Sequence, residues 1–222
     1  GSGIWVAISM VGVSSIGMIL FTSRPDGDAM ATTIWGASSS WTLTALPLFV
    51  WMGEILFRTK LSENLFEGLA PWLQKLPGGL IHVNVVGCAL FAAISGSSAA
   101  TVATVGKMSI PELRKRKYPE KILLGSLAGS GTLGLLIPPS IILIIYGVTV
   151  QESIAKLFIA GIIPGIMIAL IFMGYVIVWS LLNKNKMPTN YENFSFLNKL
   201  SKSKQLIPVI LLILGVIGSI YT

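Results

Sequence analysis

Charged residues are scarce in this sequence and almost absent from its apolar segments. Only 11% of its 222 residues are Asp, Glu, Lys or Arg, whereas about a quarter of a typical soluble domain is charged. Hydrophobic residues make up 53% of the chain. Glu54, at the end of one apolar segment, is the one charged residue associated with any of them, so a carboxylate relay for protons is not expected. These absences argue against a soluble protein and place the chain in a membrane.

Cysteine and histidine each occur once, which excludes several kinds of site. Cys88 has no second cysteine for a disulfide, and its apolar surroundings predict a small buried hydrophobic residue. We interpret His82 as a polar residue at the membrane interface, with a proton carrier as the alternative. No metal-ligating cluster and no nucleophile with a nearby base is visible, and the glycine-rich segment 129–134 lacks the lysine of a phosphate-binding loop. The sequence therefore predicts that the protein is not an enzyme.

Long uncharged segments are what the sequence has instead. Six of them are 18 to 31 residues long, and a membrane-spanning helix needs about 20 mostly apolar residues. Barrel strands would be about 10 residues long with alternating polarity, and no such alternation is present. The sequence thus predicts an all-α membrane protein with transmembrane helices. The six segments cover residues 4–22, 29–53, 76–106, 122–151, 157–183 and 205–222.

The segment 76–106 allows two architectures. It is either one crossing helix that packs through small residues, or a re-entrant helical hairpin that turns at the polar residues 95–98. In a hairpin each arm has about 13 residues and reaches about 20 Å, so the turn would lie near the middle of the bilayer. A turn at that depth must be buried in protein or face a water-filled cavity.

The positions of the basic residues favour the hairpin. The net charge of +7 comes from Lys and Arg between the apolar segments, which indicates membrane topology rather than binding of nucleic acid. With a hairpin, 14 basic residues lie on the cytoplasmic side and only Arg24 and Lys156 lie outside. With a crossing helix the division is 12 against 4. Both follow the positive-inside rule, and the hairpin follows it better.

Two adjacent prolines interrupt the fourth apolar segment. Pro138 and Pro139 have no N–H group, so in a continuous helix the carbonyls of Gly134 and Leu135 would lose their donors. The sequence predicts a discontinuous helix with free carbonyl oxygens, the alternative being a proline kink patched by Ser or Thr hydroxyls. Ser140 could cap the second half-helix, whose amide end would favour an anion. Neutral oxygens at this break and at the hairpin tip suit a hard monovalent cation such as Na⁺.

Five stretches carry a resemblance to a known family. They read LPLFVWMGE (46–54), LPGGL (76–80), ALFAAISGSSAATVA (89–103), GTLGLLIPPS (131–140) and LFIAGIIPG (157–165). In this combination and order they resemble the large membrane subunit of TRAP transporters, the DctM-like permease family. The match is specific as a set, although each stretch alone is weak.

The resemblance implies an elevator-type importer driven by Na⁺ in the bacterial inner membrane. Such an importer works with a small membrane subunit and a periplasmic substrate-binding protein, usually on organic acids such as C4-dicarboxylates or sialic acid. The co-transported Na⁺ lies between the hairpin tip and the broken helix. Carried onto this sequence, the ion ligands are Ser95, Ser97, Gly134, Ile137 and Pro139, and the adjoining substrate site includes Ser98, Thr101 and Ser140.

The predicted organisation follows from these features. Residues 1–60 are expected to form scaffold helices, and residues 61–78, apolar at helical spacing, an interfacial amphipathic helix, with a solvated loop as the alternative. Residues 79–151 would hold the re-entrant hairpin and the discontinuous helix, which form the transport element. Residues 152–222 would hold further transmembrane helices and a cytoplasmic connector.

Length is the departure from the family. Its members are considerably longer and carry a second hairpin and a second broken helix in inverted orientation, so this chain is expected to be the N-terminal half of the machine. Other readings are an elevator transporter without a soluble partner, an ion channel, or a membrane scaffold in which small residues only pack helices. No Arg or Lys in the apolar segments marks a carboxylate site, so the sequence does not name the substrate.

Overall fold

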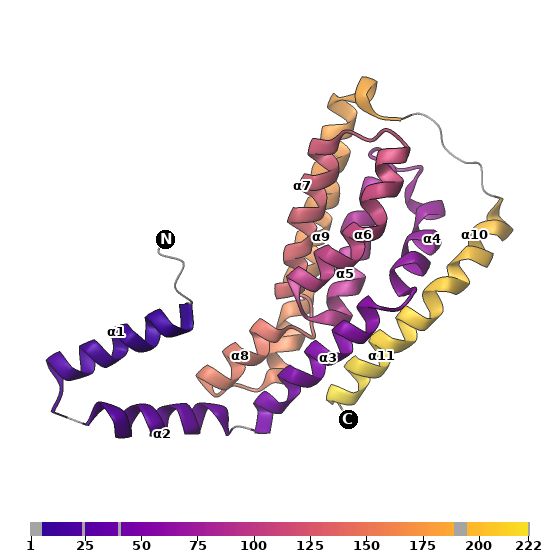
Figure 1. Ribbon diagram of the computed structural model, residues 1–222. Coiled ribbons are helices and arrows are strands. Elements are labelled where there is room, and N and C mark those ends of the chain that lie inside the picture. The colour runs from indigo at the N-terminus through magenta and orange to yellow at the C-terminus, as the bar shows by residue number, and fades with distance from the viewer. Residues whose placement is uncertain (1–5, 24, 40, 189–194, 222) are drawn as a thin grey trace. The chain divides into compact units, whose positions relative to one another are not determined.

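The computed structural model describes residues 6–23, 25–39, 41–188 and 195–221. Every secondary-structure element in these ranges is a helix, as the sequence predicts (Figure 1). The chain divides into two units, and the boundary lies between Thr44 and Ala45.

The first unit consists of α1 (Val6–Phe21), α2 (Asp26–Ser38) and the short 3₁₀ helix η1 (Trp41–Thr44). The first two helices contact each other, and Ser15 Oγ donates to Met30 Sδ over 2.9 Å. Most of their apolar side chains are exposed, as in a helix pair that faces lipid.

The apolar segment 29–53 does not form one helix. It is divided among α2, η1 and α3 (Ala45–Phe57), with a bend at Ser39. Serine hydroxyls compete with the backbone for hydrogen bonds, so adjacent serines at Ser38 and Ser39 end a helix more readily than apolar residues do. The length of an uncharged segment therefore overestimated the length of the helix within it.

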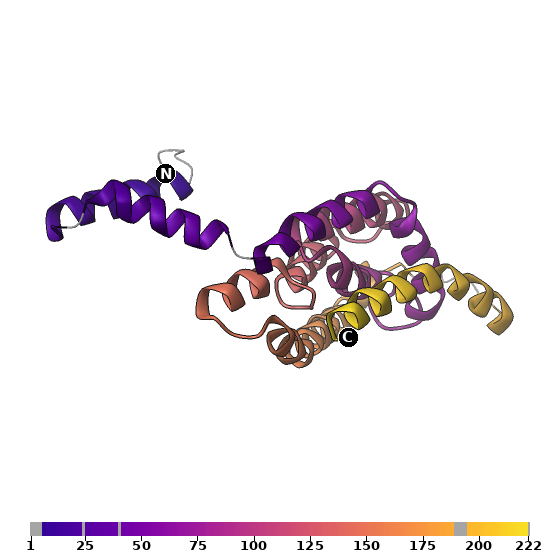
Figure 2. The same ribbon diagram turned by 90° about the horizontal axis from the view of Figure 1, so that it is seen from below.

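The second unit is built around α5 (Figures 1 and 2). This helix packs against α3, α4, α6, α7, α9 and α11. Most of its residues are buried on all sides, which is typical of an enclosed helix, and Ile81, Phe91 and Ile94 are fully buried together with the polar residues His82 and Asn84. The elements of this unit are α3 (Ala45–Phe57), α4 (Leu61–Leu73), α5 (Ile81–Ser95), α6 (Ser98–Lys115), α7 (Glu120–Gly131), η2 (Thr132–Leu135), α8 (Ile141–Val150), α9 (Ile154–Leu182), η3 (Lys184–Lys186), α10 (Phe196–Ser203), η4 (Lys204–Leu206) and α11 (Ile207–Tyr221).

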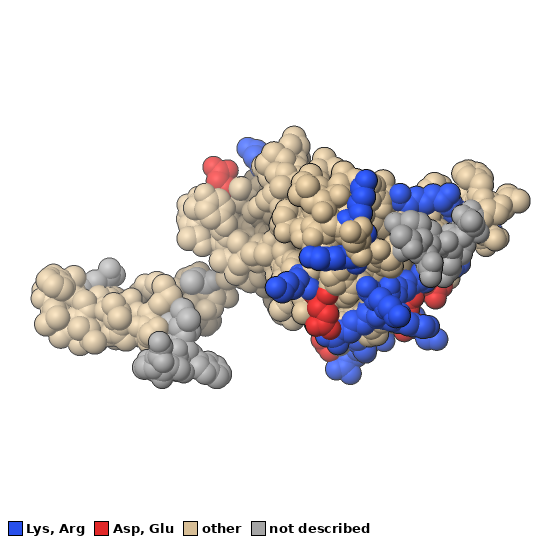
Figure 3. Space-filling view, turned by 90° about the horizontal axis from the view of Figure 1, so that it is seen from above, with Lys and Arg blue, Asp and Glu red and all other residues tan. Residues whose placement is uncertain are grey.

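Helices α5 and α6 fold back on each other, so a single continuous helix through the segment 76–106 is excluded. The Leu80 backbone N–H donates to the Tyr118 hydroxyl over 3.0 Å, which fixes the start of α5 beside the turn that follows α6. Figure 3 looks down on the end where α6 ends and α7 begins, and Lys and Arg side chains gather there. The two arms thus begin and end at one basic end of the unit.

Residues 61–78 contain a helix, α4, followed by turns, so a plain loop is excluded. Its apolar face packs into the protein core through Leu65, Phe66 and Leu69. Trp72, on its more exposed side, contacts α10: its ring lies edge-on to Phe196 with centroids 6.4 Å apart, and its Nε1–H donates to Ser203 Oγ over 2.8 Å. The cytoplasmic connector predicted within 152–222 therefore includes a helix, α10 (Phe196–Ser203), that docks on α4, while residues 189–194 before it lie outside the described ranges.

Among the described residues, two helical stretches are long and apolar enough to cross a membrane. They are α9, with 29 residues, and the continuous stretch Phe196–Ser219, with 24. Side chains along α9 are widely exposed, for example Ile163 at 76%, which fits contact with lipid. Shorter apolar helices lie at Ile8–Phe21, Leu46–Ile55, Ile81–Ser95 and Ile141–Val150.

Candidate functional site

The turn between α5 and α6 lies within the polar residues 95–98. Gly96 ends α5 in the left-handed region, with φ of 59°, which a residue without Cβ adopts at no steric cost. Ser97 follows in an extended conformation as the N-cap of α6, and its hydroxyl accepts from the Ala100 N–H over 3.5 Å. The Gly-Ser pair therefore stops one helix and starts the next.

The buried hydroxyls of Ser95 and Thr101 stabilise this tip. Ser95 Oγ and Thr101 Oγ1 lie 2.9 Å apart, and both residues are buried. Ser95 Oγ also lies 3.4 Å from the carbonyl oxygen of Ser97. Ser98 Oγ is buried as well, but it has no hydrogen-bond partner within the described part of the chain. A buried hydroxyl without a partner is costly, so Ser98 is the tip side chain best placed to accept an external ligand.

The helix that begins at α7 is interrupted over Thr132–Ser140. The helix first tightens into the 3₁₀ helix η2. After η2 the Ile137 N–H donates a hydrogen bond to Leu133 O over 2.8 Å, and α8 begins only at Ile141. Neither Pro138 nor Pro139 can donate to the carbonyls four residues earlier, which is why the α-helical pattern stops there.

Ser140 occupies the N-cap position of α8, but its side chain does not cap that helix. The prediction that Ser140 caps α8 is therefore wrong. Its hydroxyl donates instead over 2.7 Å to the carbonyl of Leu135, which has no N–H donor from Pro139. Leu135 O is accordingly not a free oxygen.

The tip and the interruption are in direct contact. A Cβ added at Gly134 would lie 2.9 Å from Ser98 N and 3.0 Å from Ser97 C, and a Cβ at Gly96 would lie 2.8 Å from Pro139 O. The Ile141 N–H donates to Gly96 O over 3.3 Å. Both backbones approach this closely because each presents a glycine at the point of contact.

Three of the five predicted ion ligands, Ser97, Gly134 and Pro139, lie at this contact, and Ser95 lies on the tip next to it, with Oγ 3.4 Å from Ser97 O. Ile137 lies on the same interruption, but its side chain packs toward α9, with Cγ1 2.8 Å from where a Cβ on Gly165 would be. Since an isoleucine side chain has no oxygen, Ile137 could serve as an ion ligand only through its backbone carbonyl. Of the three predicted substrate residues, Thr101 and Ser140 already use their hydroxyls within the protein, and Ser98 does not.

Sequence reasoning missed one participant, Gly53 of α3. A Cβ there would lie 3.5 Å from Ser95 Cβ, so α3 passes directly behind the tip. The signal was present in the stretch 46–54, which carried the resemblance but was not connected to the site.

The available donors are all neutral oxygens. Among the residues that the structure describes, no group of three or more His, Cys, Asp or Glu could hold a metal ion. Backbone carbonyls and hydroxyls suit weakly charged hard cations rather than transition metals.

Comparison with known proteins decides the family. The sequence profile described as "Tripartite ATP-independent periplasmic transporter, DctM component" matches residues 2–222. The chain belongs to this family. DctM components are transporter permeases, which are integral membrane proteins of bacteria.

Individual DctM relatives give the same result. The chain is 33% identical over 212 residues to a C4-dicarboxylate TRAP transporter large permease from Pseudomonas aeruginosa, covering 96% of this chain and 49% of that protein. It is 34% identical over 178 residues to a sialic acid TRAP transporter large permease from Vibrio cholerae, covering 79% and 42%. It is 38% identical over 148 residues to a 2,3-diketo-L-gulonate large permease from Escherichia coli, covering 67% and 35%. The chain therefore spans about half the length of the curated permeases it matches across nearly its whole length.

Proposed function

We propose that this chain forms one half of the permease of a Na⁺-coupled importer for small organic acids in the bacterial inner membrane. The observation that carries the proposal is the contact between the serine-rich tip and the proline-broken helix. Non-helical backbone inside a membrane is tolerated where it lines a site, and paired interruptions of this kind are typical of secondary transporters.

The ion would be held by oxygens from both interruptions. Ser95 and Ser97 would contribute from the tip, and the carbonyls of Gly134, Ile137 and Pro139 would contribute from the break. Together these oxygens would replace the water shell of a Na⁺ ion, and their lack of formal charge would keep binding weak enough for release.

The substrate would bind beside the ion. Helix α8 begins beside the tip, where the Ile141 N–H donates to Gly96 O, and the positive end of a helix favours an anion such as a carboxylate. Ser98, with Thr101 and Ser140 behind it, would line that side of the site. The remaining contacts would come from the second half of the permease.

The hairpin α5–α6 would be re-entrant, with its tip near the middle of the bilayer and its base at the cytoplasmic surface. The basic residues that gather at the base support this orientation (Figure 3). The amphipathic helix α4 would lie at the same surface.

The family and its relatives support the proposed partners and substrate class. A small membrane subunit and a periplasmic binding protein would complete the transporter. Several relatives are named for organic acids, namely C4-dicarboxylates, sialic acid, isethionate and 2,3-diketo-L-gulonate, and another for ectoine and 5-hydroxyectoine; the organic acids support that class for this protein.

The test is uptake by the complete permease in proteoliposomes. The permease is reconstituted with its small subunit, and radiolabelled acids from the relatives' substrates are offered with the periplasmic binding protein under an inward Na⁺ or K⁺ gradient. The proposal predicts uptake of one acid that requires both the binding protein and Na⁺. Uptake that ignores the binding protein would indicate another elevator transporter, and ion current without acid uptake would indicate a channel.

A further inference from the structure

A cavity lies beside the middle of α6, away from the tip. It has a volume of about 520 Å³ and lies between the α3–α4 connection and the middle turns of α6. Its lining includes Arg58, Lys60, Glu63, Thr104 and Lys107. None of these residues belongs to the proposed Na⁺ site, so the two sites can be tested separately.

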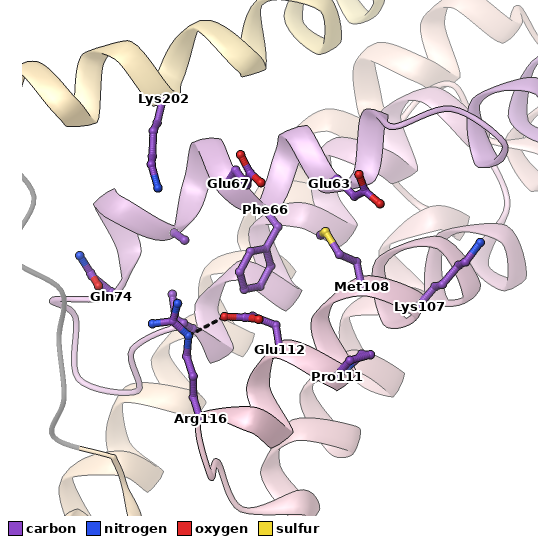
Figure 4. A pocket seen from close by; sticks show the side chains of 12 residues that line it. Glu63, Phe66, Glu67, Gln74, Lys107, Met108, Pro111, Glu112, Arg116 and Lys202 are labelled. Carbon is purple, nitrogen blue, oxygen red and sulfur yellow. Dashed lines mark hydrogen bonds and ion pairs between the residues drawn. The ribbon is translucent and has the colours of Figure 1, made fainter.

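Positive charge prevails in this cavity. Three cationic side chains and one carboxylate line it, and the Arg58 Nε–H is shared with Glu54 over 2.9 Å. The adjoining cavity, of about 550 Å³, makes a useful contrast (Figure 4). There the charges balance, with Arg116 paired to Glu112 over 2.8 Å, so the first cavity is the more favourable of the two for an anion. The charged residues of the second cavity are Lys107, Arg116, Lys202, Glu63, Glu67 and Glu112.

A buried hydroxyl also lines the first cavity. Thr104 is 1% exposed, and its Oγ1 has no hydrogen-bond partner in the described part of the chain. Buried hydroxyls are normally hydrogen-bonded, and a threonine beside lysine and arginine is a common donor to phosphate oxygens. The cavity thus combines a cationic rim with an unused donor at its wall.

The position of the cavity identifies the source of the anion. Helix α3 has Glu54 as its one charged residue, in its last turn, and is followed at once by Arg58 and Lys60, while α6 is uncharged until Gly106 and then reaches Lys107. Both elements therefore change from apolar to charged at the same cavity, which is the pattern expected at the level of lipid headgroups. Below that level α3 exposes large apolar side chains, including Trp51 at 66% and Ile55 at 50%, against which acyl chains can lie.

We propose that this cavity binds the phosphate-bearing headgroup of an anionic phospholipid. Lys60, Lys107 and Arg58 attract the phosphodiester, and Thr104 donates a hydrogen bond to one of its oxygens. Glu63 faces the same space and disfavours an additional acidic group close to its carboxylate.

Native mass spectrometry of the detergent-purified complete permease tests the proposal. Dioleoylphosphatidylglycerol and dioleoylphosphatidylcholine are added in equal amounts, and the bound lipids are counted. One phosphatidylglycerol is expected to be retained in preference to phosphatidylcholine. Equal retention of the two lipids would overturn the proposal.

The matched variants are Thr104→Val and Ser109→Ala. Both remove a buried hydroxyl without a partner from α6, and Ser109 does not line the cavity. Thr104→Val is expected to weaken phosphatidylglycerol retention about tenfold, the effect of losing one hydrogen bond to a charged group, and Ser109→Ala to leave it unchanged. Unchanged retention in Thr104→Val, or an equal loss in both variants, would contradict the assignment.

Two further measurements complete the experiment: one uses variants that remove a positive charge, and the other adds inorganic phosphate as a competitor. Lys60→Gln removes an exposed cation from the cavity rim and is expected to lower retention, whereas Lys121→Gln, also exposed at the start of α7, is not. Inorganic phosphate alone should not displace the lipid. If millimolar phosphate displaced it completely, the site would be one for free phosphate and the lipid assignment would be wrong.

Discussion

The role of Ser140 at the interruption could not be predicted from its residue type. Ser140 is a polar residue next to two prolines, and its identity alone suits a cap or a substrate ligand. Its hydroxyl instead compensates for a donor that the prolines removed, by bonding to Leu135 O at 2.7 Å. Local chemistry predicted that a carbonyl would lose its donor, but not which side chain would replace it.

Replacing Ser140 by alanine should therefore weaken the interruption itself. Ser140→Ala is expected to lower the unfolding free energy of the purified permease by about 1 kcal/mol, the usual value of one hydrogen bond, seen as a lower apparent melting temperature. Ser219→Ala is the control, since the exposed Ser219 hydroxyl makes a similar bond, to Val216 O, on α11. Equal melting temperatures for Ser140→Ala and wild type would argue against this role.

The positions of both interruptions could be predicted from the sequence because each depends on local backbone chemistry. Gly96 supplies the left-handed residue that ends α5, and Pro138 and Pro139 remove hydrogen-bond donors. The pairing of Ser95 with Thr101 could not be predicted in the same way, because it depends on rotamers and on the exact angle between two helices.

At the scale of helices, the hairpin is held firmly at its base. The Tyr118 hydroxyl accepts from the buried Leu80 N–H over 3.0 Å, and the His82 ring lies 2.8 Å from Pro77 O. The base is thus tied to the turn between α6 and α7, whereas the tip rests on the interruption. We expect the hairpin to move together with α7 rather than to pivot at its base.

Tyr118→Phe tests this anchor. The change leaves the Leu80 N–H buried without its acceptor, which should cost about 1–3 kcal/mol and lower the melting temperature by several degrees. Tyr175→Phe is the matched control, because Tyr175 is 60% exposed on α9. Thermal unfolding of the two purified variants, followed by circular dichroism, is the measurement, and identical melting temperatures would show that the base is not held by Tyr118.

Helix periodicity predicted α4 well, but not its environment. The spacing of Leu65, Leu69 and Leu73 indicated an amphipathic helix, and the structure has one at Leu61–Leu73. Its apolar face packs on protein, with Leu65 at 2% exposure, because α5 and α11 lie beneath it. Periodicity tells which face of a helix is apolar, and it does not tell what covers that face.

For the molecule as a whole, the account requires that both ends of the hairpin lie on one side of the membrane. Single cysteines can be placed at Lys75, Lys121 and Glu152, all exposed, in a complete permease from which Cys88 and any other cysteine have been removed. A membrane-impermeant maleimide should label positions 75 and 121 from the cytoplasmic side and position 152 from the opposite side. Labelling of 75 and 121 from opposite sides would show that the segment crosses the membrane.

The fold class and the family could be predicted from the whole sequence, because scarcity of charge and the order of five stretches are global signals. The sequence did not reveal the division at Thr44, since it results from packing between helices rather than from composition.

Uptake by Gly134→Ala tests the central claim most directly. The added Cβ would lie 2.9 Å from Ser98 N, so the tip and the broken helix must separate, whereas a Cβ at Gly125, on α7, meets nothing within 4 Å. The account predicts that Gly134→Ala lowers Na⁺-driven acid uptake by about tenfold or more at normal expression and assembly, and that Gly125→Ala leaves uptake near wild type. Wild-type uptake with an unchanged dependence on Na⁺ in Gly134→Ala would contradict an ion site at this contact.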